Sequence, residues 1–305
     1  ADGGFDMEAL VEKVARFDVK AIEIKLSQGA KPGKGGVLPA AKVTPEIAAI
    51  RGIPVGKSCL SPSYHTAFDG PDSLLDFVES IAERTGVPVG IKSAVGETRF
   101  WDELARLMSE TGRGVDYIAI DGGEGGTGAA PLVFSDHVAL PFYLAMSRVY
   151  SIFARQGLDD KVIFVGSGRL GLPDRAMLAF GLGCDMIAVA REAMLSIGCI
   201  QAQNCHTGHC PAGVATQNRW LMRGLDPTLK AARLANYMTV FRADVLALAH
   251  ACGVAHPSLV TLDDLEILDG QFGSRLAREA FAYNEGWGVP GKTDRELLLE
   301  LMTQA

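Results

Sequence analysis

Residues 162–191, VIFVGSGRLGLPDRAMLAFGLGCDMIAVAR, contain one complete strand–helix–strand unit. The apolar runs Val162–Gly166 and Met186–Ala190 predict two strands, and the amphipathic stretch Pro173–Leu182 between them predicts a helix. Strands that are joined through a helix in this way pair in parallel by a right-handed crossover. The unit therefore predicts an α/β fold built on a parallel sheet.

Outward from this unit, the same alternation of strand and helix covers most of the chain. Short apolar runs, each followed by a glycine-containing turn, predict the remaining strands, and the stretches between them predict helices. The other predicted strands are Ala21–Leu26, Val87–Lys92 and Tyr117–Asp121, and the other predicted helices are Asp72–Arg84, Arg99–Glu110, His137–Arg155 and Glu192–Gly198. Two architectures share this rhythm, a doubly wound open sheet and a (β/α)8 barrel.

Two features favour the barrel. No Gly-x-Gly-x-x-Gly sequence follows the first strand, and the phosphate-type turns come after the last two strands, where barrels commonly hold a phosphate. A closed barrel of this type needs eight strands, whereas about five can be found here. We therefore expect a (β/α)8 TIM barrel whose first strands are missing from this chain, with Ala21–Leu26 and Met186–Ala190 as its two edges.

Polar side chains stand at or just after the carboxyl ends of the predicted strands. These residues are Lys25, Lys92, Asp121, Ser167 and Arg191. Parallel strands place their carboxyl ends on a common face, where both kinds of α/β fold bind ligands. We expect these side chains to lie at one end of the sheet and to mark the functional site.

The sequence pattern changes after about Gln217. Long helical stretches follow, Pro227–Cys252 and Leu262–Leu268, and then a tail rich in turn-forming residues. We predict a barrel domain over residues 1–217, with a cysteine loop at 199–210, and a mostly helical C-terminal extension over residues 218–305. Apolar residues at helical spacing predict that the extension packs on the outside of the barrel or forms an oligomer contact.

The composition is that of an ordinary globular protein, with 48% hydrophobic and 21% charged residues. A net charge of −7 without a basic cluster argues against a nucleic-acid-binding surface. The sequence contains no apolar run as long as a membrane span and no hydrophobic signal core, so we expect a cytoplasmic protein. Six cysteines in 305 residues are too few for a disulfide scaffold.

Three of the cysteines lie in one short loop. Cys199, Cys205 and Cys210 occupy the sequence CIQAQNCHTGHCP, in which the last cysteine precedes a proline. Thiolates arranged in this way are typical of iron–sulfur ligation, and we expect the three sulfurs to converge on one point. A zinc site is the alternative, because His206 or His209 could supply a fourth ligand.

Glycine-rich and lysine-rich loops follow the predicted strands. In DGGEGGTGAAP, at 121–131, successive glycines let backbone N–H groups approach a flat ring or an anion. The turns at 165–169 and 189–191 place small residues ahead of a helix N-terminus, where a phosphate monoester fits. Segment 22–36 carries three lysines and four glycines. Its lysines would hold a flavin ring or substrate carboxylates if a flavin lies nearby, and otherwise the segment is a solvated loop.

Three segments resemble the FMN-binding domain of glutamate synthases, most closely the stand-alone FMN-binding glutamate synthase family proteins. They are IEIKLSQGAKPGKGGVLPAAKVTPEIAAIRG at 22–52, DGGEGGTGAAP at 121–131 and GCIQAQNCHTGHCPAGVATQ at 198–217. The resemblance implies a (β/α)8 barrel with FMN at its carboxyl face. It also implies a three-iron 3Fe-4S cluster bound by Cys199, Cys205 and Cys210.

The resemblance further implies an activity. Electrons would pass through the cluster to FMN, and the reduced flavin would deliver hydride to 2-iminoglutarate, formed from 2-oxoglutarate and ammonia, to give L-glutamate. Such an enzyme is an oxidoreductase of the class that acts on CH–NH2 donors. Its expected partner is an electron donor or a glutaminase subunit, because the sequence shows neither a nicotinamide fingerprint nor a glutaminase nucleophile. Ammonia could otherwise come from solution.

By motif match, the resemblance assigns roles to individual residues. Lys25 and Lys31 would be catalytic, and Lys31, Arg51 and Ser61 would bind the substrate. The cofactor-binding residues would be Lys25, Gln28, Lys92, Asp121, Gly125, Gly126, Ser167, Gly168, Ala190 and Arg191.

Departures from the family pattern bear on the substrate. Val37 stands where glutamate synthases have a substrate-contacting glutamine, and Gly166-Ser-Gly-Arg169 and Ala190-Arg191 replace their Asp-Gly-Gly and Gly-Thr turns. Two alternatives therefore stand beside the glutamate synthase activity. One is an FMN barrel oxidoreductase acting on another small oxo, imino or hydroxy acid, and the other is a non-catalytic electron-carrier subunit.

Overall fold

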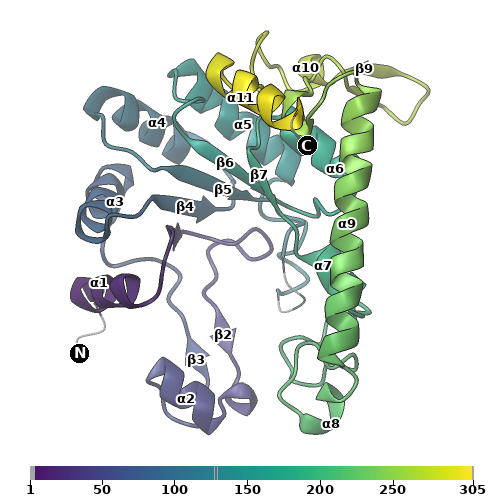
Figure 1. Cartoon of the computed structure of the whole chain (residues 1–305). Helices are drawn as coiled ribbons and strands as arrows, with labels where there is room; N and C mark the ends of the chain where they lie inside the picture. Colours follow the sequence, from purple (N-terminus) through teal and green to yellow (C-terminus); the bar gives the residue numbers. More distant parts are fainter. Residues whose placement is uncertain (1–3, 127, 129, 304–305) are drawn as a thin grey trace.

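The central feature of the fold is a sheet of five parallel strands (Figure 1). The computed structural model describes residues 4–126, 128 and 130–303. Within these residues the strand order across the sheet is β1-β4-β5-β6-β7, which is also the order along the chain. A doubly wound sheet reverses its strand order at a switch point, whereas a barrel does not. The predicted α/β class is confirmed, and the strand order is that of consecutive strands in a (β/α)8 barrel.

Each strand lies close to its predicted bounds. The strands of the sheet are β1 (Ile22–Lys25), β4 (Val89–Ser93), β5 (Tyr117–Asp121), β6 (Ile163–Ser167) and β7 (Met186–Ala188). Within the described residues, β1 and β7 each pair with one neighbour only. They are therefore the two edges of the sheet, as predicted.

The two faces of the sheet differ in how well they are covered. Ile24, Ile91 and Phe164 belong to the main hydrophobic core, and each is at most 6% exposed. Because side chains alternate along a strand, the neighbouring residues point to the opposite face. Ile163 and Met186 lie on that second face and are 46% and 52% exposed. Helices thus cover one face, and the other is more open.

The helices that cover the buried face follow one another along the chain. They are α3 (Pro71–Thr85), α4 (Arg99–Thr111), α5 (Phe142–Arg155) and α6 (Pro173–Gly181), with α1 (Met7–Arg16) packed against α3 and α7 (Arg191–Ser196) following β7. The largest difference from the predicted bounds is at the start of α5, which begins at Phe142 and not at His137. Pro141 precedes the helix, and the residue before a proline is restricted away from helical conformation, which prevents an earlier start.

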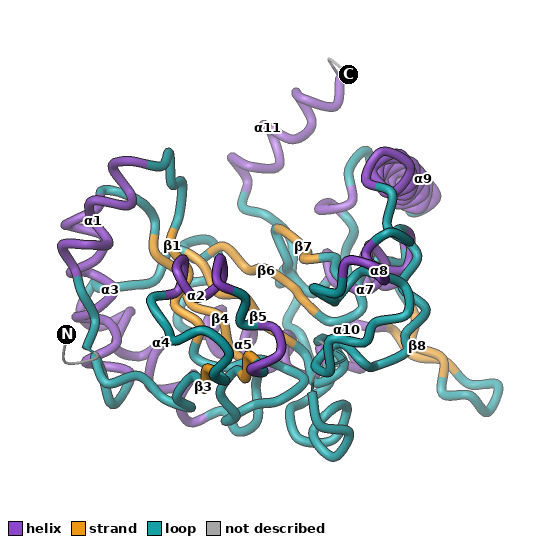
Figure 2. The backbone as a smooth tube through the Cα atoms, turned by 90° about the horizontal axis from the view of Figure 1, so that it is seen from below, coloured by secondary structure: helices purple, strands orange, loops and turns teal. Residues whose placement is uncertain are grey.

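Residues 26–70, between β1 and α3, extend below the sheet, and we call them the excursion (Figures 1 and 2). The excursion contains the antiparallel pair β2 (Val37–Leu38) and β3 (Cys59–Leu60), with a 3-10 turn (Ala40–Lys42) and α2 (Pro45–Arg51) between them. Seen from below, α2 lies between the α1–α3 side and the α7–α9 side of the molecule. The sequence pattern predicts only a loop here, because strands this short give no periodicity.

The C-terminal part is mostly helical, as predicted. Its helices are α8 (Arg219–Met222), α9 (Pro227–Ala251), α10 (Ala277–Ala280) and α11 (Lys292–Thr303), with a 3-10 turn at Pro257–Leu259. The long helix α9 packs against α6 and α7, and Met177, Val245 and Ala249 form a second small core there. The boundary near Gln217 stays a prediction. No helix in the described ranges combines the length and hydrophobicity that crossing a membrane requires.

The predicted helix at Leu262–Leu268 is wrong. This region contains β8 (Glu266–Leu268), which pairs antiparallel with β9 (Ser274–Leu276). Between them, the Asp269 carboxylate accepts hydrogen bonds from the N–H groups of Gln271 and Gly273 at 2.7 and 2.9 Å. Such local side-chain bonds compete with helix formation and favour a turn, and a short apolar run does not reveal that competition.

Candidate functional site at the carboxyl edge of the sheet

The predicted polar residues meet at one end of the sheet. The strand register pairs Lys25 with Lys92 and Asp121 with Ser167, and these residues stand at or next to the carboxyl ends of their strands. Arg191 begins α7, shortly after the end of β7. The expectation of a shared edge is therefore confirmed.

The buried carboxylate of Asp121 connects three segments. It accepts the Gly29 N–H at 2.8 Å and the Ser167 hydroxyl at 3.0 Å. A Cβ atom on Gly29 would lie 1.9 Å from the Gly122 carbonyl oxygen, so only glycine permits this approach. Asp121 and Gly29 thereby fix the lysine-rich loop directly on the glycine-rich loop.

The glycines of the loop at 121–131 also approach their neighbours closely. A Cβ atom on Gly125 would lie 2.7 Å from the Asp121 carboxylate, and one on Gly126 would lie 2.1 Å from the Cβ atom of Ala30. Gly126 has a φ of +142°, which L side chains rarely adopt. Thr127 and Ala129 of the predicted loop lie outside the described residues.

Lysine side chains gather at the ends of β1 and β4. The Lys25 ammonium donates to the Gln28 side-chain oxygen at 3.1 Å, and Lys92 pairs with Glu23 at 2.7 Å. Partial burial and the neighbouring ammonium groups of Lys92 and Lys31 lower the pKa of Lys25. We call this region at the carboxyl ends of β1 and β4 the lysine corner. It is positively charged and therefore suited to bind an electron-rich ring or an anionic substrate.

Two arginines lie side by side at the other end of the edge. The side chains of Arg169 and Arg191 both donate to the Glu124 carbonyl oxygen, at 3.1 and 3.3 Å, and Arg169 also pairs with Asp136 at 3.0 Å. Burial and the adjacent Arg169 lower the pKa of Arg191. Two guanidinium groups in this arrangement favour binding of an anion such as a phosphate.

Sequence reasoning missed the roles of Arg169 and Glu124. Arg169 belongs to the predicted phosphate turn, but that prediction rests on the small residues of the turn and assigns no role to the arginine side chain. The Glu124 carboxylate accepts the Phe142 N–H through both oxygens at 2.9 Å, which caps the start of α5. The sequence feature that points to the arginine pair is an arginine after each of two consecutive strands. No local sequence feature predicts that Glu124 caps α5.

The predicted substrate residues are not all brought together. Lys31 lies near enough to Lys25 to lower the pKa of Lys25. The Ser61 N–H donates to the Gly36 carbonyl at 2.8 Å. Arg51 lies exposed at the end of α2, and within the described residues its side chain has no hydrogen bond or ion pair. Figure 1 shows α2, which Arg51 ends, below the sheet and apart from its strands.

The three loop cysteines are free thiols. Burial acts to raise the pKa of Cys210, but the N–H groups of residues 212–215 point at its sulfur and hold the pKa below its usual value. The Cys205 sulfur touches the glycine-rich loop, since a Cβ atom on Gly128 would lie only 2.8 Å from it. The cysteine loop and the glycine-rich loop are thus in direct contact.

The expected convergence of the three sulfurs on one point is not observed. In the part of the chain that is described, no three His, Cys, Asp or Glu side chains gather closely enough to hold a metal ion. This arrangement offers no ligand set to the zinc alternative. A cluster is larger than one ion and takes each cysteine at a different iron, so its ligands stand further apart than those of a single ion.

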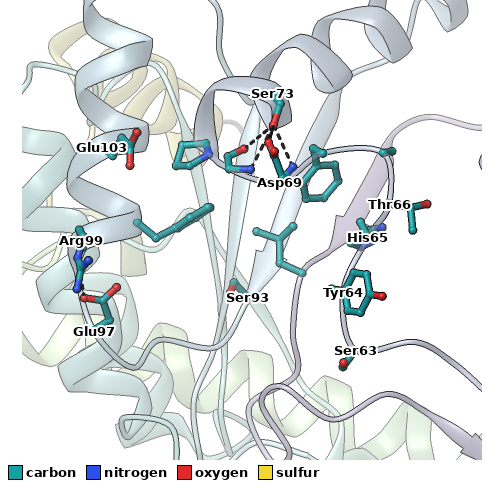
Figure 3. A pocket seen from close by; sticks show the side chains of 16 residues that line it. Ser63, Tyr64, His65, Thr66, Asp69, Ser73, Ser93, Glu97, Arg99 and Glu103 are labelled. Atoms are coloured by element: carbon teal, nitrogen blue, oxygen red, sulfur yellow. Dashed lines mark hydrogen bonds and ion pairs between the residues drawn. The ribbon is translucent and has the colours of Figure 1, made fainter.

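A large cavity of ≈ 1070 Å³ lies beside the lysine corner. Figure 3 shows Tyr64 and His65 of the excursion on one side of it and Arg99 and Glu103 of α4 on the other, with Ser93 between. Its lining includes none of the residues predicted to bind cofactor or substrate. The cavity therefore adjoins the candidate site at Leu26 and Ser93, which follow Lys25 and Lys92 in the chain, but shares none of its predicted residues.

The fold and the site together define a class, a parallel α/β protein with charged side chains at the carboxyl ends of its strands. A family model described as the conserved region in glutamate synthase matches residues 11–255. The chain belongs to the glutamate synthase family.

Relatives in this family are similar over most of the chain. The glutamate synthase large subunit-like protein YerD of Bacillus subtilis is 40% identical over 256 residues, which are 84% of this chain and 49% of YerD. The archaeal glutamate synthase [NADPH] of Methanocaldococcus jannaschii is 37% identical over 77% of this chain and 46% of its own. The chain thus spans about half the length of these relatives.

A solved structure of a flavocytochrome b2 variant with sulfite bound aligns with 95% of this chain and 55% of its own, with 14% identity and a TM-score of 0.48.

Proposed function

We propose that the chain is the FMN- and iron–sulfur-binding part of an oxidoreductase that converts 2-oxoglutarate and ammonia to L-glutamate. The conversion consumes two electrons and two protons and releases one water. Family membership supports it, and the observation that carries it is the contact between Gly128 and Cys205. This contact would place an iron–sulfur cluster beside a flavin on the glycine-rich loop.

The residues at the carboxyl edge fit FMN. The Arg169–Arg191 pair matches the charge of its phosphate, and the ammonium groups of Lys25 and Lys92 match the electron-rich edge of its ring. The glycines at 125 and 126 let the glycine-rich loop pack directly against Asp121 and Ala30, which holds this loop at the strand ends where the flavin would bind. When bound, FMN would supply hydride chemistry and the cluster would supply single electrons.

The cysteine loop fits a cluster in its donor chemistry. Cysteine binds a cluster as a thiolate, and the N–H groups around the Cys210 sulfur stabilise the thiolate form. Cys199 and Cys205 are partly exposed free thiols on the same loop. We infer that all three would bind iron.

The excursion would bind the substrate. Lys31 and Arg51 carry the positive charges that would hold the carboxylates of 2-oxoglutarate, and Ser61 would add a hydroxyl. Arg51 would have to move toward the strand ends when substrate binds, because α2 lies below the sheet (Figure 1). Within the described residues no hydrogen bond or ion pair holds its side chain back. The electron donor and a glutaminase partner are proposed as well. The names of the relatives include NADPH in the Methanocaldococcus protein and ferredoxin in that of Cyanidium caldarium.

A second candidate follows from Val37. This residue is 55% exposed on β2, between Lys31 and Arg51 in the chain. An apolar side chain where the family has a glutamine offers no hydrogen bond to a dicarboxylate. An FMN oxidoreductase acting on a less polar oxo, imino or hydroxy acid would tolerate this change.

The test of the proposed function is oxidation of the reduced flavin. Anaerobically reduced protein should be reoxidised by 2-oxoglutarate with ammonia. One glutamate should form for each reduced flavin that is oxidised. Lys31→Met should raise the KM for 2-oxoglutarate about 10–100-fold, because a charge-assisted hydrogen bond contributes about 1.5–3 kcal/mol. Lys57→Met, an exposed lysine between β1 and α3, is the matched control. Reoxidation by other oxo acids but not by 2-oxoglutarate would support the second candidate instead.

FMN binding tests the arginine pair. Arg191→Met should weaken FMN binding about 10–100-fold, because one charged partner of the phosphate is lost. Riboflavin lacks the phosphate, so its affinity should not change. Arg148→Met, an exposed arginine on α5, should behave like the unchanged protein. Equal losses for FMN and riboflavin would show that Arg191 supports the fold and not the phosphate.

A further inference from the structure

Lys42 reaches from the excursion into the cysteine loop. Its ammonium donates to the carbonyl oxygen of Cys205 and, at 3.2 Å, to that of Ala215. Its side chain also runs past Gly208, where a Cβ atom would lie 3.9 Å from the Lys42 Cε atom. Lys42 therefore connects Cys205 inside the cysteine loop with Ala215 just after it, and we call the stretches around these two residues the arms of the loop.

The backbone around Lys42 is held in place by its own contacts. Lys42 ends the 3-10 turn, with its N–H donating to the Pro39 carbonyl at 2.9 Å. The next residue, Val43, is only 3% exposed. The Ala40 N–H at the start of the turn donates to the Ser58 hydroxyl at 3.0 Å. These contacts fix the backbone that carries the Lys42 side chain, so the ammonium group is held next to the cysteine loop.

The charge of Lys42 is not neutralised by a carboxylate. No ion pair of Lys42 with an acidic side chain exists among the described residues, and its hydrogen-bond acceptors are the two carbonyl oxygens. The loop has one further closing bond, from the Thr216 hydroxyl to the Gly208 carbonyl. Of the two side chains that make these contacts, Lys42 and Thr216, only Lys42 is charged, and its ammonium lies next to Cys205.

We propose that Lys42 is a positioning residue for the iron–sulfur cluster. Its two hydrogen bonds hold the arms of the cysteine loop together, and its charge stabilises the negative charge that thiolate ligands and reduced iron bring to Cys205. This inference rests on the proposed function. Because Lys42 lies between Lys31 and Arg51 in the chain, it also ties the proposed substrate-binding segment to the cluster loop.

The test compares Lys42→Met, which removes the charge but keeps most of the volume, with Lys42→Arg, which keeps the charge. Lys57→Met, an exposed lysine of the same excursion, is the control. In iron-free protein, Lys42→Met should speed amide hydrogen exchange at 203–216 about tenfold or more, because a charged hydrogen bond no longer closes the loop. Exchange in the central sheet should not change.

The second readout is the reduction potential of the cluster in anaerobically reconstituted protein. Lys42→Met should shift it to more negative values, because net charge near a cluster sets its potential. Lys42→Arg should restore most of it, and the flavin potential should stay constant. A role confined to holding the loop would speed exchange in Lys42→Met and leave the potential of the cluster unchanged.

Each remaining outcome decides the proposal. Unchanged exchange in Lys42→Met would overturn the clamp, and an unchanged potential would overturn the charge effect. An equal effect of Lys57→Met would overturn the specific role of Lys42. If the unchanged protein takes up no iron, the proposed function and the charge effect are both wrong, and the exchange measurement still decides on the clamp.

Discussion

Replacing Cys205 by serine should remove the iron–sulfur cluster and leave the sheet folded. Cys205 is the cysteine in contact with the glycine-rich loop. Serine has nearly the same shape, but its hydroxyl is not deprotonated at neutral pH and binds iron poorly. Loss of residues that only support a metal ligand lowers metal affinity about 10–100-fold, so loss of a ligand itself should cost at least as much.

Iron content and the visible absorption spectrum after anaerobic purification measure this effect. Cys252→Ser is the matched control, because Cys252 is a free thiol just after α9, outside the cysteine loop. The control should keep its iron. Thermal unfolding of both variants should show an intact fold. Full iron content in Cys205→Ser would contradict ligation by this residue.

Gly29→Ala should have the largest effect on flavin binding. The new methyl group would lie 1.9 Å from the Gly122 carbonyl oxygen and 2.7 Å from that of Asp121. Both atoms belong to the backbone, so the loops must separate and the hydrogen bond from Gly29 to Asp121 must break. Overpacking and a lost buried hydrogen bond each cost about 1–3 kcal/mol, which should lower FMN affinity by about 100-fold.

Gly36→Ala is the matched control in the same lysine-rich loop. A Cβ atom there would lie 3.4 Å from the Ser61 hydroxyl, which is an ordinary contact. Fluorescence titration with FMN should show normal affinity for this variant. Normal affinity in Gly29→Ala as well would mean that the contact between the two loops is not needed for the flavin.

The sequence predicts the frame of the molecule because the frame depends on local patterns. The apolar run Tyr117–Ile120 predicts β5, and Ile118 and Ile120 are fully buried in it. Once the strands are parallel, their carboxyl ends must meet, so the neighbourhood of Asp121 and Ser167 follows from topology alone.

The contacts that complete the site are not local. Lys42 and Cys205 are 163 positions apart, and Arg169 and Glu124 are 45 apart. No periodicity connects such residues, and each contact depends on how a loop folds back on the sheet. For the same reason the excursion, with its two-residue strands β2 and β3, could not be predicted.

The two edges of the sheet differ in their resistance to unwanted strand pairing. Charged side chains on an edge strand disfavour the approach of another strand, and β1 carries Glu23 and Lys25. The opposite edge, β7, consists of Met186, Ile187 and Ala188 and carries no charge. Unwanted pairing of this sheet with another strand should therefore begin at β7. Met186→Lys should reduce such pairing, because it places a charge on this edge strand.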